Sequence, residues 1–183
     1  MGKAAVFLDR DDTLIENVPY LGDPGKVQLL PGTQDALQKL HHSGLPLIVV
    51  SNQSGVGRGL ITKEQVRSVD ARMEELLGIS SLFLDYRHCF AAPGDPYDER
   101  RKPSPLMLQE AAAEHDLDLA RSFMVGNRLS DIQAGHAAGC ITVLLKLRIH
   151  PEDQKASSSL ANYAASTWPE ATDWILAKAK SHR

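Results

Sequence analysis

The sequence predicts an α/β fold, namely a three-layer, doubly wound (Rossmann-like), mostly parallel sheet with helices on both faces. Short apolar runs alternate along the chain with stretches whose apolar residues recur at helical spacing, and this alternation is typical of βαβ units. The runs are short and apolar, as strands buried on both faces of a sheet should be. The length of 183 residues suits one domain with a full core, so we expect a single domain over residues 1–183.

Six runs are predicted as strands. In chain order they are Ala4–Leu8, Leu45–Val50, Leu82–Phe90, Phe123–Val125, Ile141–Leu145 and a weaker run, Asn162–Ala165. Parallel strands need helical crossovers, and ligands then bind beyond the carboxyl ends of the strands, near a switch in strand order.

Signals for helix ends fill the gaps between these strands. Pro31-Gly32-Thr33 starts a helix that Gly44 ends, Thr62 with Gln65 forms a capping box, Ser104-Pro105 opens a third helix, a fourth begins near Ser130, and Thr167 with Glu170 forms a second capping box. Apolar residues at helical spacing follow both boxes. The segment from Ala156 to Ser159 is interpreted as at most a short mobile loop.

Bulk properties exclude several classes of function. The formal net charge is -3, and Arg100, Arg101 and Lys102 are too local to form a basic stripe, so nucleic acid is not an expected partner. Two cysteines, Cys89 and Cys140, are too few for a disulfide framework. No long apolar segment or leader precedes the first strand. We expect a cytoplasmic monomer that does not contact membranes.

The first apolar run leads directly into Asp9-Arg10-Asp11-Asp12-Thr13. In an extended backbone Asp9 and Asp11 point the same way. Two acids held side by side can divide the labour of phosphoryl transfer, because one can attack phosphorus while the other protonates the leaving oxygen and later activates water. Alone, such a pair would more often be a turn or a helix cap.

Three further segments carry chemistry that suits a phosphate ester. One predicted strand is followed by Ser51-Asn52-Gln53-Ser54-Gly55, a loop carries Arg100-Arg101-Lys102-Pro103, and another strand is followed by Gly126-Asn127-Arg128-Leu129-Ser130-Asp131. The Ser51 hydroxyl with free loop amides can hold a phosphate, and Lys102 can neutralise it. Asn127 and Asp131 can complete a magnesium site with the first acids.

Taken in this order and spacing, the four segments resemble the haloacid dehalogenase (HAD) superfamily of phosphatases, from Ala4 to about Leu145. Within it, residues 7–11, residues 51–59 (Ser-Asn-Gln-Ser-Gly-Val-Gly-Arg-Gly) and Arg101-Lys102-Pro103 are most similar to the D-glycero-D-manno-heptose 1,7-bisphosphate 7-phosphatases and the histidinol phosphatases.

The resemblance implies roles for most of these residues. Asp9 would be the nucleophile and Asp11 the general acid and base, and both would bind magnesium. Lys102 would pair with the phosphate and with Asp9, while Ser51 with Asn52 would grip the transferring group. Arg101 and Arg58 are candidates for more distant substrate groups such as a second phosphate. The implied activity is a magnesium-dependent phosphomonoesterase that acts on a small phosphorylated sugar of the heptose bisphosphate type.

The chain departs from the family pattern in two loops. Neither gap between motifs leaves room for the cap domain that family members often carry, so we expect a capless, open site with selectivity in the loops. Relatives often fold a zinc loop from three cysteines and a histidine, whereas this chain keeps only His88 and Cys89 there. Because a structural zinc needs four ligands, we expect no zinc.

Two single residues also depart from the pattern. Asp12 stands where relatives usually have glycine, and Asn127 stands where they usually place a metal-binding Asp. Asp is among the few residues other than glycine that tolerate unusual turn dihedrals. Whether Asn127 or Asp131 binds the metal directly stays open. A histidinol-phosphate or other small-ester phosphatase is the enzymatic alternative, and a phosphate-binding scaffold on an impaired HAD fold is the alternative from another class.

Overall fold

A computed structural model describes residues 2–149 and 151–181. Its six strands form one sheet in the order β3-β2-β1-β4-β5-β6, and every neighbouring pair is parallel. The strands are β1 (Val6–Leu8), β2 (Leu47–Asn52), β3 (Asp85–Cys89), β4 (Phe123–Gly126), β5 (Ile141–Leu145) and β6 (Tyr163–Ala165). The predicted doubly wound α/β sheet is therefore confirmed.

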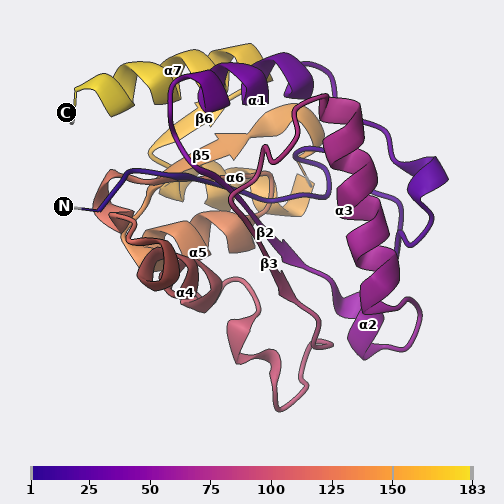
Figure 1. The fold of residues 1–183 in the computed structure, drawn as a ribbon. Coiled ribbons are helices and arrows are strands. Elements are labelled where there is room, and N and C mark those ends of the chain that lie inside the picture. The colour runs from indigo at the N-terminus through magenta and orange to yellow at the C-terminus, as the bar shows by residue number, and fades with distance from the viewer. Residues whose placement is uncertain (1, 150, 182–183) are drawn as a thin grey trace.

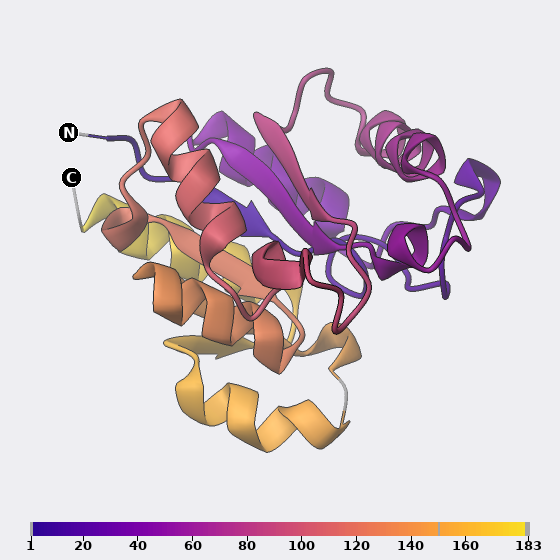
Figure 2. The same ribbon diagram turned by 90° about the horizontal axis from the view of Figure 1, so that it is seen from below.

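The helices form a layer on each face of the sheet, as Figures 1 and 2 show. They are α1 (Thr33–His42), α2 (Ser54–Gly57), α3 (Lys63–Leu77), α4 (Leu106–His115), α5 (Leu129–Ala138), α6 (Pro151–Leu160) and α7 (Trp168–Lys180). Helices α1, α3 and α7 cover one face and α4 and α5 cover the other. Among the described residues, no helix is both long and apolar enough to cross a membrane.

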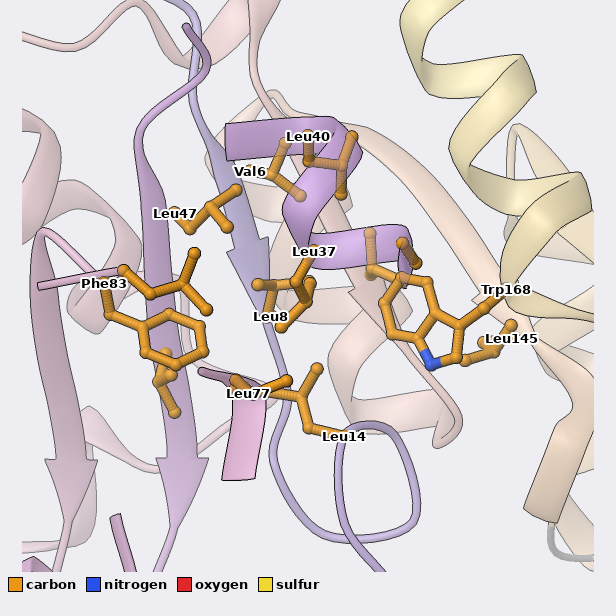
Figure 3. Packing of buried hydrophobic residues seen from close by; sticks show 14 of the residues in the cluster. Val6, Leu8, Leu14, Leu37, Leu40, Leu47, Leu77, Phe83, Leu145 and Trp168 are labelled. Atoms are coloured by element: carbon orange, nitrogen blue, oxygen red, sulfur yellow. The ribbon is translucent and has the colours of Figure 1, made fainter. Parts of the chain in front are cut away.

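The strand residues alternate between two apolar cores, because successive side chains of a strand point to opposite faces. Val6 and Leu8 of β1 enter the larger core under α1, α3 and α7, while Phe7 enters the smaller core under α4 and α5. Figure 3 shows the larger core, in which the Trp168 indole lies near Leu37. Both cores hold the short β1 rigidly in the middle of the sheet.

The strand order reverses at β1, which lies between β2 and β4. The chain winds outward from β1 through β2 to β3, and then crosses back to β4 on the other side of β1. At such a switch point the connections leave in opposite directions, and a crevice opens beyond the carboxyl ends of the strands. The carboxyl ends of β1, β2 and β4 therefore meet at one place.

No cap domain interrupts the fold over the described residues. Between β1 and β2 the chain forms a flap with the 3-10 helix η1 (Pro24–Lys26) and then α1, and between β2 and β3 it forms only α2 and α3. After β3 a loop with the short η2 (Asp98–Arg100) leads to α4. The capless arrangement that we expected from the sequence is confirmed.

Three sequence-based expectations need correction. Ala156 to Ser159 is not a loop but part of α6, whose first turn holds Pro151 and two acids that favour a helix N-terminus. The strand predicted over Leu82–Phe90 is limited to β3, because Leu82 and Phe83 pack into the core before it begins. Thr167 caps the Glu170 N–H as predicted, but Glu170 accepts from the Ser166 N–H, so that capping box is incomplete.

Candidate active site

The carboxyl end of β1 delivers Asp9 and Asp11 to a cleft of about 490 Å³. The Asp9 N–H donates to the carbonyl oxygen of Val125 in β4, at 2.9 Å. Asp12 then adopts a φ of 60°, so the unusual turn dihedral expected of this residue is confirmed. The Trp168 indole N–H donates to the Thr13 carbonyl oxygen at 3.0 Å. The acidic turn is thus tied both to the neighbouring strand and to the start of α7.

Lys102 reaches Asp9 from the loop before α4. Its ammonium lies 2.7 Å from Asp9 Oδ1, 2.6 Å from Asp131 Oδ1 and 2.7 Å from the Val50 carbonyl oxygen. An ammonium has three protons to donate, so these contacts use all of them. Lys102 and Asp131 are almost fully buried. The lysine is therefore fixed beside the carboxylate that we expect to act as nucleophile.

In this cluster one ammonium, that of Lys102, is shared by two carboxylates, those of Asp9 and Asp131. Burial raises the pKa of the Asp9 carboxyl to about 7, and the charge of Asp131 adds to the effect while Lys102 opposes it. Burial acts to lower the pKa of Lys102, but the charges of Asp131 and Asp9 outweigh it and hold that pKa above its usual value. Lys102 therefore stays charged, and the cluster favours a further cation.

The end of β2 contributes polar side chains that are held by Gln53. The Gln53 Nε2 donates to Ser51 Oγ at 2.7 Å and to Asp11 Oδ2 at 2.8 Å. The Asn52 amide is bound to the Lys102 backbone instead, through Nδ2 to the carbonyl oxygen at 3.1 Å and Oδ1 from the N–H at 3.0 Å. Ser51 thus lies by the acids as predicted, whereas the Asn52 amide holds the Lys102 loop in place.

Asn127 and Asp131 both follow β4, but their side chains have different hydrogen-bond partners. The Thr13 hydroxyl lies 3.2 Å from Asn127 Oδ1 and 3.3 Å from Asp9 Oδ2, so it links the amide oxygen to the Asp9 carboxylate. Both oxygens of Asp131 are already engaged, one by Lys102 and the other by the Arg128 N–H at 3.0 Å. Gly126 permits this approach, because a Cβ there would collide with the Asp131 carboxylate.

These oxygens fit a magnesium ion. Magnesium prefers oxygen ligands and binds through one or two carboxylates together with water and phosphate oxygens. The Thr13 hydroxyl is within hydrogen-bond distance of both Asp9 Oδ2 and Asn127 Oδ1, and Asp9, Asp11 and Asn127 all border the same cleft. Asp131 is the poorer candidate for a direct ligand, because its two oxygens are bonded to Lys102 and to the backbone.

Of the two arginines proposed for substrate contacts, Arg101 lies at the cleft and Arg58 does not. Arg101 lines the cleft, together with Arg128 and flap residues that include Asn17 and Tyr20. Arg101 Nη1 is buried without a hydrogen-bond partner in the described part of the chain. Arg58 is exposed at the end of α2 and does not line the cleft. The structure thus brings Arg101 to the acids but leaves Arg58 outside.

His88 and Cys89 do not form a pair of metal ligands. Adjacent residues of β3 point to opposite faces of the sheet, and Cys89 lies in the smaller core while His88 Nε2 lies 2.7 Å from Asp70 Oδ2. Asp85, Glu114 and His115 do gather elsewhere in the described chain. Arg87 forms ion pairs with both of those acids, so we interpret the group as a structural ion-pair network.

Sequence reasoning missed Arg10, Gln53 and Asp70. Arg10 stands between Asp9 and Asp11 in the sequence. It is buried, and it forms ion pairs with Asp11 and with Asp70 of α3. A signal for Asp70 was present, since it lies four residues after Val66 and three before Met73, on the apolar stripe of its helix. An acid on a buried stripe needs a charged partner, and Arg10 is that partner. A cavity of about 620 Å³ beside Asp70 and β3 is lined by none of the residues predicted to bind magnesium or substrate.

Comparison with known proteins identifies relatives of this chain. The family model described as HAD-hydrolase-like matches residues 99–168. The D-glycero-beta-D-manno-heptose-1,7-bisphosphate 7-phosphatase of Mesorhizobium japonicum is 39% identical over 74% of this chain and 65% of its own length. The D-glycero-D-manno-heptose-1,7-bisphosphate 7-phosphatase of Thermosynechococcus vestitus is 33% identical over 96% of each chain.

Solved structures show the same likeness. The D,D-heptose 1,7-bisphosphate phosphatase of B. bronchiseptica, in complex with magnesium and phosphate, superposes with a TM-score of 0.85 and 25% identity, over 96% of this chain and 99% of that one. The architecture described above is therefore shared along almost the whole length of both chains.

Proposed function

Because this chain belongs to the haloacid dehalogenase (HAD) superfamily of phosphatases, we propose that it is a magnesium-dependent phosphomonoesterase that acts through an aspartyl-phosphate on Asp9. We propose as its substrate a sugar bisphosphate such as D-glycero-D-manno-heptose 1,7-bisphosphate. The observation that carries the proposal is the buried Asp9 carboxylate, held 2.7 Å from Lys102 beside Asp11 at the end of β1.

The first step is attack of an Asp9 carboxylate oxygen on phosphorus. Lys102 donates to Asp9 Oδ1 and the Thr13 hydroxyl to Oδ2, so both oxygens of this carboxylate are held in place beside the cleft. Asp11 donates a proton to the ester oxygen as the bond to phosphorus breaks, and the alcohol leaves. The phosphoryl group then resides on Asp9.

The second step is hydrolysis of that aspartyl-phosphate. The Asp11 carboxylate takes a proton from water as the water oxygen attacks phosphorus, which restores Asp11 to its acid form and frees Asp9. Asp9, Asp11 and Asn127 would hold the magnesium ion, which offsets the repulsion between carboxylate and phosphate when bound. The charge of Lys102 would neutralise the phosphoryl group, and the Ser51 hydroxyl would bind one of its oxygens.

The substrate assignment rests on the names of the relatives and on the shape of the cleft. Both relatives compared above carry the name of a heptose bisphosphate 7-phosphatase. The capless cleft of about 490 Å³ admits a small phosphorylated sugar, and Arg101 and Arg128 border it where a second phosphate would need positive charge. Histidinol phosphate is the alternative substrate, and a panel of both esters separates the two.

The test is phosphate release by the purified protein with magnesium and with a chelator. Asp9→Asn should abolish turnover, because an amide cannot supply the attacking oxygen, and acid quenching should trap phosphate on Asp9 of the wild type. Asp35→Asn, on the exposed face of α1, is the matched control and should keep full activity. Turnover by Asp9→Asn at the wild-type rate would disprove the mechanism. Phosphate binding without turnover in the wild type would favour the scaffold alternative.

A further inference from the structure

Arg10 stands between Asp9 and Asp11 in the sequence. Its side chain is only 1% exposed, although arginine is almost never fully buried unless it is paired. Its Nε and Nη2 each lie 3.2 Å from Asp11 Oδ1, and its Nη1 lies 2.9 Å from Asp70 Oδ1. One guanidinium therefore joins a cleft carboxylate to a carboxylate on α3.

Asp70 is in turn held from behind. His88 of β3 lies with Nε2 2.7 Å from Asp70 Oδ2, so each Asp70 oxygen has its own partner. The His88 ring packs between Tyr86 and Phe90, at centroid distances of 6.1 Å and 5.7 Å. The resulting chain of contacts runs from β3 through α3 to the turn after β1, and its inner members are buried.

Asp11 is the more exposed of the two members of this chain that line the cleft, with a side chain 24% exposed against 1% for Arg10. Arg10 contacts it from one side, and Gln53 Nε2 donates to its Oδ2 at 2.8 Å from another. A partly exposed carboxylate without such contacts would sample several rotamers. Proton transfer needs a donor within hydrogen-bond reach of the leaving oxygen, so a fixed Asp11 favours it.

A contribution to stability does not by itself explain the buried pair of Arg10 and Asp70. Burying an arginine and an aspartate removes both from water, and replacing such a pair by apolar residues of similar volume is often neutral or stabilising. In this chain the guanidinium is instead directed at the carboxylate that borders the site. The planar fork of arginine suits this task, because it can bind two carboxylates in fixed directions while a lysine acts as a point charge.

We propose that Arg10 and Asp70 are positioning residues that orient Asp11 for proton transfer to the leaving oxygen. The inference rests on the proposed function. In the step that it concerns, an Asp9 oxygen bonds to phosphorus, the bond from phosphorus to the ester oxygen breaks, and the Asp11 proton moves to that oxygen to give the alcohol. Arg10 and Asp70 touch no reacting atom, and they act only through the position of Asp11.

The test compares two esters of similar size and different leaving groups. Benzyl phosphate releases a strongly basic alkoxide unless it is protonated, whereas p-nitrophenyl phosphate releases a stable phenolate that needs little help from a general acid. The ratio kcat/KM reports the steps through departure of the leaving group. Loss of Asp11 orientation should therefore reduce kcat/KM for the benzyl ester selectively, while partial loss of folded enzyme reduces both equally.

Asp70→Asn and Arg10→Lys should lower kcat/KM for benzyl phosphate about tenfold or more, and for p-nitrophenyl phosphate less than about threefold. Asp11→Asn is the reference variant. It should lower kcat/KM by more than the other variants do, again more for the benzyl ester than for the p-nitrophenyl ester. Glu75→Gln is the control, since it removes an acid on the exposed side of the same helix. If either single variant fails to fold, the double variant Arg10→Gln with Asp70→Asn leaves no unpaired buried charge and should show the same selectivity.

Equal losses for the two esters, or no loss for either, would overturn the inference while the phosphatase function stands. If Asp11→Asn itself showed no selectivity, Asp11 would not be the general acid, and the mechanism and the inference would both be wrong. A wild-type protein that hydrolyses neither ester would overturn the proposed phosphomonoesterase activity and the inference with it.

Discussion

Lys102 and Asp131 form an ion pair of 2.6 Å in the buried floor of the cleft. The other Asp131 oxygen accepts from the Arg128 N–H, so this acid is occupied on both sides. Its geometry is that of a residue that orients a cation of the site. In the proposed mechanism Asp9 attacks phosphorus and Asp11 transfers a proton, and the contacts of Asp131 add an acid that holds the lysine.

Asp131→Asn should therefore act on Lys102 more than on magnesium. Weakening a buried ion pair on one side should lower the free energy of unfolding by about 1–3 kcal/mol and raise KM for the phosphate ester. The magnesium concentration for half-maximal activity should move less than about threefold, whereas loss of a charged direct ligand should shift it by about tenfold or more, because ligand charge sets much of the affinity. The measurement is a magnesium titration of the activity of the wild type and of Asp131→Asn. A rise of about tenfold in the magnesium concentration for half-maximal activity would indicate that Asp131 binds the metal directly.

We expect no tightly bound zinc in the purified protein. His88 is bonded to Asp70, and Cys89 faces the opposite core, so the loop before Lys102 lacks the four ligands of a structural site. Elemental analysis should give far less than one zinc per chain, and the melting temperature should not fall in strong chelator without magnesium. Stoichiometric zinc would contradict this prediction.

Arg101→Ala should distinguish a bisphosphate from a monophosphate. Arg101 lines the cleft, and its buried Nη1 has no hydrogen-bond partner among the described residues, so we expect this side chain to contact a substrate group away from the reacting phosphorus. Its loss should raise KM for heptose bisphosphate about tenfold or more, and for a monophosphate by much less, with kcat little changed. Arg100→Ala is the matched control, because Arg100 pairs with Glu110 outside the cleft. Equal effects of Arg101→Ala on both substrates would refute a distal contact.

The sequence predicted the parts of the site that lie at strand ends. Asp9, Ser51 and Asn127 follow predicted strands, and the parallel sheet brings such ends together whatever their separation along the chain. Lys102 lies in a loop, and only its resemblance to a family motif located it. The fold likewise followed from periodicity, because short apolar runs and helical stripes have distinct spacings.

Side-chain partners were less predictable. Nothing in the local sequence shows that the Asn52 amide binds the Lys102 backbone, since the two residues lie 50 positions apart. Arg58 looked suitable because its loop resembles a substrate loop, but the direction of α2 leaves it outside the cleft. The helix over 156–159 was missed because its Ser-rich run lacks an apolar stripe, while Pro151 and the acids after it mark its start.

The raised pKa of Asp9 predicts that magnesium affinity depends on pH. A carboxyl with a pKa of about 7 is mostly protonated at pH 6, and that proton must leave before the oxygen can bind a cation. Magnesium should therefore bind more tightly at pH 8 than at pH 6, and binding at pH 6 should release protons. Calorimetry at both pH values, in buffers of different ionisation enthalpy, measures the two effects. The pH dependence should weaken in Asp9→Asn, and its persistence there would assign it to another group.

The last prediction concerns Asn127, whose Oδ1 faces Asp9 while its Nδ2 donates to the Arg148 carbonyl oxygen at 2.9 Å. An amide oxygen can coordinate magnesium but brings no negative charge, and ligand charge is a large part of the affinity. We therefore expect a weak site that works at millimolar magnesium.

Asn127→Asp should have opposite effects on the two states of the protein. Without metal, the new carboxylate adds like charge beside Asp9 and faces the Arg148 carbonyl oxygen, so the melting temperature should fall in chelator. With magnesium, the added charge should tighten binding about tenfold and recover the lost stability. Asn162→Asp is the control, because it accepts from Thr142 through Oδ1 far from the cleft, and its stability should not respond to magnesium. If Asn127→Asp binds magnesium no more tightly than the wild type, Asn127 is not a ligand and only shapes the turn after β4.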